Sequence, residues 1–152
     1  MTDPIQDLTH DHADINRRVL AIGAAIRALD RDGGNGLARA LVGRLGELRE
    51  LLFTHFAREE EGLFPFVTDA VSALTASIAE MATAHDAICG ALARVYHLAE
   101  SNADIASITH MYTRFEAAYA SHSEAEGRLL QQLGHVLDPA QRDQLSGLVR
   151  GL

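Results

Sequence analysis

Apolar side chains recur at steps of three and four residues along four long segments of this sequence. That spacing places them on one face of an α-helix, and helices of this kind pack together as a bundle at shallow crossing angles. Strict alternation of apolar and polar residues, which would indicate strands, is missing. The sequence therefore predicts an all-α protein, an up-down-up-down four-helix bundle with a short C-terminal fifth helix.

Glycine and proline divide the chain into these helices. The first is expected to begin at Pro4, because Asp3-Pro4 has the form of an N-cap followed by proline at the first helical position. The run Gly33-Gly34-Asn35-Gly36 predicts a break, and a second break is expected after Pro65. The predicted helices span residues 4–30, 37–65, 69–100, 104–133 and 139–148, within a single domain over residues 1–152.

Weaker signals set the remaining boundaries. Thr68 or Asp69 is expected to cap the third helix, and the polar run Ser101–Asp104 predicts the break before the fourth. Gly134 is expected to close the fourth helix, and Asp138-Pro139 to open the fifth.

Each apolar seam is interrupted at one level by histidine or glutamate. These residues are His12, His55, Glu59, His85, His122 and Glu126. Counting residues from the predicted loops places all four histidines in one layer of an antiparallel bundle. Burying such groups costs several kcal/mol unless something compensates them, and two facing carboxylates cost more. A cation in the layer is the simplest compensation, so we predict that these six residues are metal ligands.

Two of the seams carry the spacing His-x-x-x-Glu, which stacks both side chains on one face of a helix. The pairs are His55 with Glu59 and His122 with Glu126. A metal pair fits this geometry, because a carboxylate is able to bridge two ions about 3.5–4 Å apart. Imidazoles and carboxylates without a thiolate favour iron or manganese over a Cys-rich structural zinc site, although zinc stays open.

Other polar residues are given lesser roles. The remaining histidines that fall off the seams or follow a helix end are expected to be solvated; they are His10, His97, His110 and His135. Glu60 and Glu61 are assigned to a solvated face, with Glu60 as a candidate outer partner of the site. Tyr119 is either a core residue or a hydrogen-bond donor into the site, one turn from His122. Cys89 is interpreted as a small buried residue rather than a ligand.

Composition narrows the classes of partner. A chain of 152 residues with 47% apolar content suits one domain without disulfides. A formal net charge of −8 without a basic cluster argues against nucleic acid and anionic membranes. No run of about 18 apolar residues and no N-terminal export signal is found, and the single Cys89 gives no internal disulfide. A cytoplasmic protein that meets small molecules, with a redox partner or a homodimer left open, is expected.

The layer residues and their neighbours resemble the hemerythrin-like family, also described as HHE cation-binding domains. The resemblance covers nearly the whole chain and rests on His12, the second-helix run from His55 to Pro65, His85-Asp86, and His122-x-x-x-Glu126. It implies a di-iron centre, two non-haem Fe ions with an oxo or hydroxo bridge. In that centre Glu59 and Glu126 would bridge, His12 and His55 would bind one iron, and His85 and His122 the other.

Two departures separate the chain from related proteins. Ferritin-like di-iron bundles use Glu-x-x-His, the reverse order. The oxygen-carrying hemerythrins have a further third-helix histidine where this chain has Met81, and a longer His-x-x-x-x-Asp motif in the fourth helix. Fewer imidazoles disfavour simple reversible oxygen carriage.

The expected function is therefore that of a non-haem di-iron protein which reacts with or binds a small oxidant or diatomic ligand: hydrogen peroxide, dioxygen or nitric oxide. Turnover such as catalase-like peroxide decomposition is the leading form. A sensor of oxygen, nitric oxide or iron without turnover is the alternative. The third reading is a structural bundle whose histidines are only hydrogen-bonded or hold zinc inertly.

Overall fold

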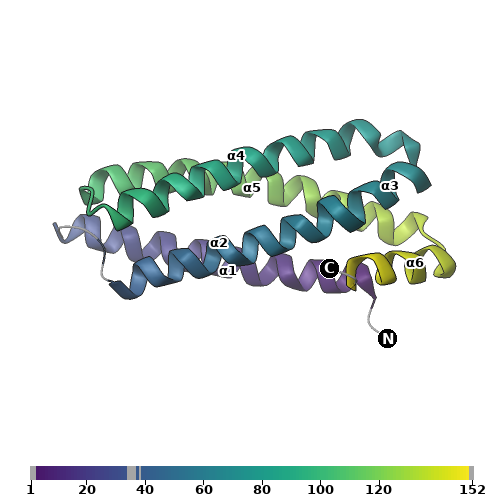
Figure 1. The fold of residues 1–152 in the computed structure, drawn as a ribbon, viewed down its shortest axis with the longest axis horizontal. Coiled ribbons are helices and arrows are strands. Elements are labelled where there is room, and N and C mark those ends of the chain that lie inside the picture. Colours follow the sequence, from purple (N-terminus) through teal and green to yellow (C-terminus); the bar gives the residue numbers. More distant parts are fainter. Residues whose placement is uncertain (1–2, 34–36, 38, 151–152) are drawn as a thin grey trace.

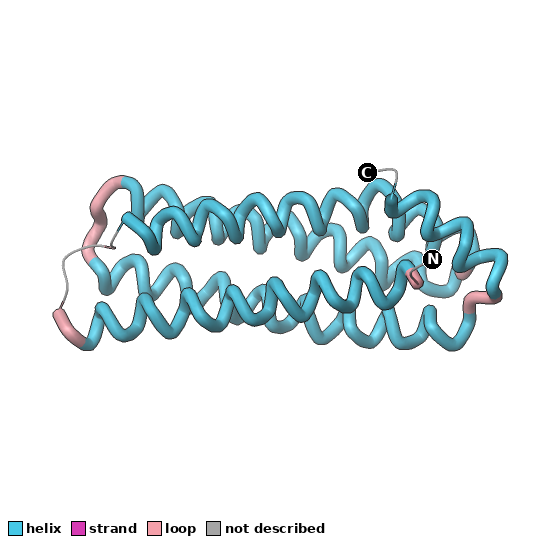
Figure 2. Tube along the Cα trace, turned by 90° about the horizontal axis from the view of Figure 1, so that it is seen from below, coloured by secondary structure: helices cyan, strands magenta, loops and turns pink. Residues whose placement is uncertain are grey.

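The structure, a computed structural model, describes residues 3–33, 37 and 39–150 and folds as an antiparallel helical bundle (Figures 1 and 2). Its long helices are α1 (Pro4–Arg31), α2 (Arg39–Arg58), α4 (Thr75–Glu100) and α5 (Ile105–Val136). The packed pairs are α1–α2, α2–α4, α4–α5 and α1–α5, which closes the bundle. Strands are absent from the described residues, and the predicted all-α bundle is confirmed.

Shorter elements lie at the end of the bundle that holds both termini (Figure 1). A π turn (Glu59–Leu63) and α3 (Phe64–Ala70) extend α2, and a 3₁₀ turn (Ser72–Leu74) precedes α4. Helix α6 (Pro139–Arg150) follows α5 and packs against the π turn. It is the predicted fifth helix, longer by two residues.

Capping side chains are present at three helix starts, including the predicted N-cap Asp3. The Asp3 carboxylate accepts from the Ile5 N–H ahead of Pro4, and Asp104 accepts from the Ser107 N–H at 3.1 Å. Asp138 and Gln141 cap α6 reciprocally, each side chain accepting from the other's N–H. Such caps satisfy N–H groups that have no partner inside the helix.

The predicted end of the second helix at Pro65 is wrong. The helix runs on to Ala70, so Thr68 and Asp69 lie inside α3 and do not cap a helix. Proline lacks an N–H, and its ring clashes with the carbonyl four residues earlier in a regular helix. The π turn widens the backbone just before Pro65, with the Phe64 N–H bonded to the Glu59 carbonyl, and we attribute the helix's passage through the proline to it.

Other boundaries also differ from the prediction, and the largest difference is at α4, which begins at Thr75 and not at residue 69. Gly134 does not close the fourth helix, since α5 runs to Val136. The first break contains Gly33, whose φ of 72° suits glycine, but Gly34–Gly36 lie outside the described residues. Helix α2 begins at Arg39, two residues later than expected.

Apolar clusters flank the predicted polar layer on both sides. On α1, His12 lies between Leu8 of one cluster and Ile15 of the other; on α5, His122 lies between Tyr119 and Leu129 in the same way. No helix among the described residues combines the length and apolarity needed to cross a bilayer.

Candidate metal centre

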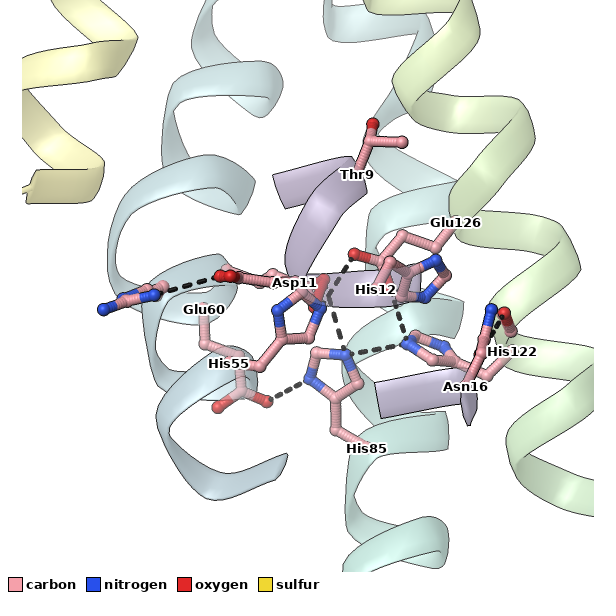
Figure 3. A network of polar contacts seen from close by, with 12 residues as sticks. Thr9, Asp11, His12, Asn16, His55, Glu60, His85, His122 and Glu126 are labelled. Atoms are coloured by element: carbon pink, nitrogen blue, oxygen red, sulfur yellow. Dashed lines mark hydrogen bonds and ion pairs between the residues drawn. The ribbon is translucent and has the colours of Figure 1, made fainter. Parts of the chain in front are cut away.

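The structure brings the six predicted ligand residues together inside the bundle. His12 comes from α1, His55 from α2, Glu59 from the π turn and His85 from α4; the last two, His122 and Glu126, come from α5. None is more than 7% exposed. Figure 3 shows the imidazoles of His12, His55, His85 and His122 turned toward one another in the space between the helices.

These residues form two groups whose ligand atoms lie within 4.8 Å of one another. The first triad is His12, His55 and Glu126. The His12 Nε2 atom is 3.1 Å from Glu126 Oε2, and His55 Nε2 is 3.3 Å from Glu126 Oε1. Both oxygens of this carboxylate therefore face imidazole nitrogens from other helices.

The second triad is Glu59, His85 and His122. The two imidazoles meet through their Nε2 atoms at 3.1 Å, and His85 Nε2 is 3.8 Å from Glu59 Oε2. Both glutamates also contact the other triad, because Glu59 Oε1 is 2.7 Å from His55 Nε2 and Glu126 Oε2 is 3.1 Å from His122 Nε2. A carboxylate between the two triads is placed as a bridge between two ions would be.

Several buried atoms of the layer lack a hydrogen bond of normal geometry despite these short distances. They include both oxygens of Glu59, Glu126 Oε2, His12 Nε2, His55 Nδ1 and His122 Nδ1. Buried polar groups in native proteins are almost always hydrogen-bonded, so each exception needs an explanation. The oxygens of Glu59, Glu126 Oε2 and His12 Nε2 lie close together without aligning on a donor, which suits a cation, and the residues present therefore fit a metal pair.

Electrostatics make the first triad a tight ion pair in the absence of metal. Burial opposes the charge on His55, but its close contacts with the carboxylates of Glu126 and Glu59 outweigh burial and raise the His55 pKa to about 10. Burial likewise opposes the Glu126 charge, yet bonds from His12, His122 and His55 hold the pKa of Glu126 well below its usual range.

In the second triad, the charged forms of the side chains are disfavoured. Burial and the neighbouring charge of Glu126 raise the pKa of Glu59 well above its ordinary value. Burial and the charges of His122 and His55 lower the pKa of His85 to about 3. His85 is therefore neutral at pH 7, which is the form that binds a metal.

The π turn positions two carboxylates at once. Glu59, its first residue, points into the layer, and Glu60 lies on the outside with a side chain 43% exposed. Glu60 Oε1 is 3.2 Å from His85 Nδ1, the ring nitrogen turned away from the triad (Figure 3). Carboxylates of this kind orient metal-binding histidines, and the geometry predicted for Glu60 as an outer partner is present.

Aromatic rings form one wall of the second triad. Phe56 stacks on His85 with centroids 3.7 Å apart and planes 9° apart, and it meets His122 edge-on at 5.5 Å. Phe64 stacks on the same imidazole at 5.4 Å. The apolar spacing predicted no role for these rings, because Phe56 lies beside the apolar seam and not on it. Its position directly after His55 was the available signal.

Grooves reach the site from two sides. One lies between α4 and α5, has a volume of about 510 Å³, and includes Met81, His122 and Arg128 in its lining. The other lies between α1 and α2, has about 220 Å³, and includes His55 beside Asp11 and Glu50. Each triad thus has one imidazole that lines a groove.

The structure also places the other residues for which a role was predicted. His10, His97, His110 and His135 are exposed, as expected. Cys89 belongs to neither triad, and burial together with Glu60 and Asp86 raises its pKa to about 11, so the thiol stays protonated. The Tyr119 hydroxyl is buried beside the first triad, and burial together with Glu126 and Glu59 raises its pKa.

Comparison with known proteins agrees with this geometry at the level of the family. No curated protein and no solved structure matches the chain. The family model described as the hemerythrin HHE cation binding domain matches residues 3–133, which include all six residues of the layer. The chain belongs to the hemerythrin HHE cation-binding family.

Proposed function

We propose that this protein holds two iron ions in the two triads and reacts with or binds a small oxidant or diatomic ligand, with peroxide decomposition as the leading reaction. The observation that carries the proposal is the pair of triads joined by Glu59 and Glu126, in which several buried oxygens and imidazole nitrogens lack a hydrogen bond. Nitrogen and oxygen ligands without a thiolate suit iron or manganese better than structural zinc.

The irons would supply redox chemistry between the ferrous and ferric states. The protein's own residues hold and shield the centre. His12 and His55 would bind one ion, and His85 and His122 the other. Glu60 fixes the orientation of the His85 ring by its contact with the Nδ1 atom of that histidine. Phe56 and Phe64 cover the His85 ring and keep water from that side.

Access for a small ligand is provided by the groove between α4 and α5. Met81 and His122 line it, and small side chains such as Ala118 and Ala125 lie along it. This route supports a small substrate. We also propose that the protein works in the cytoplasm and meets small oxidants or gases there.

The test is metal content with the optical spectrum of the purified, iron-loaded protein. We expect two irons per chain and near-ultraviolet bands of a bridged pair, followed by oxygen release when peroxide is added. His122→Ala should lower the iron content, whereas His110→Ala, an exposed histidine on the same helix, should not. Iron uptake without oxygen release would favour a sensor or binding role, and no iron or a single zinc would contradict the proposal.

A further inference from the structure

The hydroxyl of Tyr119 is buried and has no hydrogen-bond partner in the described structure, and the residue is 2% exposed. A buried tyrosine hydroxyl usually finds a partner, because leaving it unpaired is unfavourable. Among the described residues, the other buried side-chain atoms without a partner belong to five of the six layer residues, apart from Arg49 Nε. The Tyr119 hydroxyl therefore shares the unusual property of the metal ligands.

Tyr119 also lies against the layer. It is one turn before His122 on α5, and its ring centroid is 6.3 Å from that of His12. Phe115 stacks on the other side with centroids 6.2 Å apart and holds the ring in place. On the same α1–α5 face, Ser123 and Asn16 are paired with each other, since the Ser123 hydroxyl donates to Asn16 Oδ1 at 3.2 Å.

A second tyrosine on the same helix provides an internal comparison. Tyr112 lies seven residues before Tyr119, and its hydroxyl donates to the backbone carbonyl of Val19 on α1. On α1, His12 lies seven residues before Val19. The two tyrosines thus occupy equivalent places two turns apart. The Tyr112 hydroxyl, in the apolar part of the bundle, bonds to a backbone carbonyl, whereas the Tyr119 hydroxyl, beside the polar layer, has no partner.

We propose that the Tyr119 hydroxyl donates a hydrogen bond to the small ligand bound at the first triad, beside His12. It is a positioning residue for ligands that carry an acceptor atom, such as peroxide or azide. No bond is formed or broken, and the proton stays on the phenol oxygen. This inference rests on the proposed function, because it needs a metal that accepts an outside ligand.

The experiment compares Tyr119→Phe with Tyr112→Phe, its matched control, in the full iron-loaded chain, using azide as the probe. Optical titration should show azide binding at least about tenfold weaker in Tyr119→Phe, the expected effect of losing a hydrogen bond to a charged group. Tyr112→Phe should bind azide as the wild type does. The vibration of bound azide should shift in heavy water in the wild type and not in Tyr119→Phe.

Thermal unfolding of the metal-free proteins gives a second measurement that does not depend on the loaded centre. Tyr112→Phe should melt lower because it loses a bond to the Val19 carbonyl, whereas Tyr119→Phe should melt at the wild-type temperature or above. Equal azide affinity in Tyr119→Phe and wild type would overturn the proposal. So would a fall in melting temperature equal to that of Tyr112→Phe, since the hydroxyl would then have a structural partner.

Two further outcomes are distinguishable from these. A visible phenolate-to-iron band that disappears in Tyr119→Phe would make Tyr119 a metal ligand and overturn the donor role. A wild-type protein that takes up no iron would contradict the proposed function, and the role of Tyr119 would fall with it. The metal-free comparison would still decide whether the hydroxyl has a partner within the protein.

Discussion

The two triads contain the same kinds of residue and differ in how charge is arranged. In the first, both oxygens of Glu126 face imidazoles, and the pKa of His55 is raised to about 10. In the second, His85 and His122 meet each other at 3.1 Å, and the pKa of His85 is lowered to about 3. Without metal, the first triad holds a charged pair, whereas the second keeps His85 neutral and raises the pKa of Glu59.

This difference has a consequence for metal loading. A metal that binds His55 must displace a proton held by an ion pair, whereas His85 is already neutral at pH 7. We therefore expect metal binding at His55 to weaken more steeply than metal binding at His85 as the pH falls. Identical ligand types do not make equivalent sites, because the position of each carboxylate oxygen decides the protonation of the histidines.

The largest effect is expected from Glu126→Gln. This carboxylate contacts His12, His55 and His122, so its loss removes the charge that stabilises one triad and the bridge to the other. Breaking a buried pair in this way costs about 3–5 kcal/mol. The free energy of unfolding of the metal-free protein, measured in urea, and the iron content of the loaded protein should both fall. Glu124→Gln, at an exposed neighbouring position, serves as the control. Unchanged unfolding would show that the first triad does not depend on Glu126.

A smaller effect, confined to the second triad, is expected from Glu60→Gln. The variant weakens the contact with His85 Nδ1. Loss of an outer partner of this kind typically lowers metal affinity about 10–100-fold. Metal titration should show one weakened site of two, with the exposed Glu61→Gln as the matched control. If both sites weaken equally, Glu60 does not act on the second triad alone.

The pH dependence of metal-free stability should separate the two histidines. The His55 pKa is raised from 6.5 to about 10, so its contribution is complete below pH 6.5 and is lost as the pH rises toward 10. The slope is at most about 1.4 kcal/mol per pH unit. The His85 pKa is lowered from 6.5 to about 3, so stability falls as the pH drops between these values.

Urea unfolding of the metal-free protein at several pH values checks these signs. His55→Gln should flatten the alkaline limb and His85→Gln the acid limb, each leaving the other limb in place. If the stability of His85→Gln still falls at acid pH, the fall is due to carboxylates such as Glu126, whose lowered pKa also makes the protein less stable as the pH drops.

The smallest effect is expected from Gly62→Ala on the π turn. An added Cβ would come 3.3 Å from the Leu148 carbonyl oxygen of α6, so the α6 backbone must shift by a few tenths of an ångström. We expect a melting temperature a few degrees lower, from a loss of about 1 kcal/mol. Gly90→Ala, at an open helical position, should not lower it. A larger loss of iron than of stability would show that α6 controls the position of Glu59.

The sequence predicted what depends on helical periodicity. The step of three and four residues was enough to place Leu8, His12 and Ile15 on one buried face, and to bring the six polar residues to one level. These predictions succeed because periodicity decides which side chains of a helix are buried, and buried polar side chains must find partners on the neighbouring helices.

Features that depend on backbone detail were not predicted. Pro65 was taken as a helix end because a regular helix cannot accept it, whereas a π turn does. The contrast between His55 and His85 depends on which oxygen faces which nitrogen, and the stacking of Phe56 depends on its rotation about the helix axis. Spacing alone carries none of this information.

The π turn also fixes how the chain tolerates changes of length. Such a turn holds one residue more than the matching stretch of α-helix, so deleting one residue between Glu59 and Phe64 would restore regular winding and leave the helix beyond it in nearly the same phase. Phe64 would stay near the His85 ring and α3 in the core, but the Pro65 ring would then meet the carbonyl four residues before it. In the connections around Gly33 and Asn102, an added residue would be absorbed at little cost. Insertions and deletions in relatives should therefore collect in those connections, and a one-residue deletion between Glu59 and Phe64 should occur only together with loss of the proline at position 65.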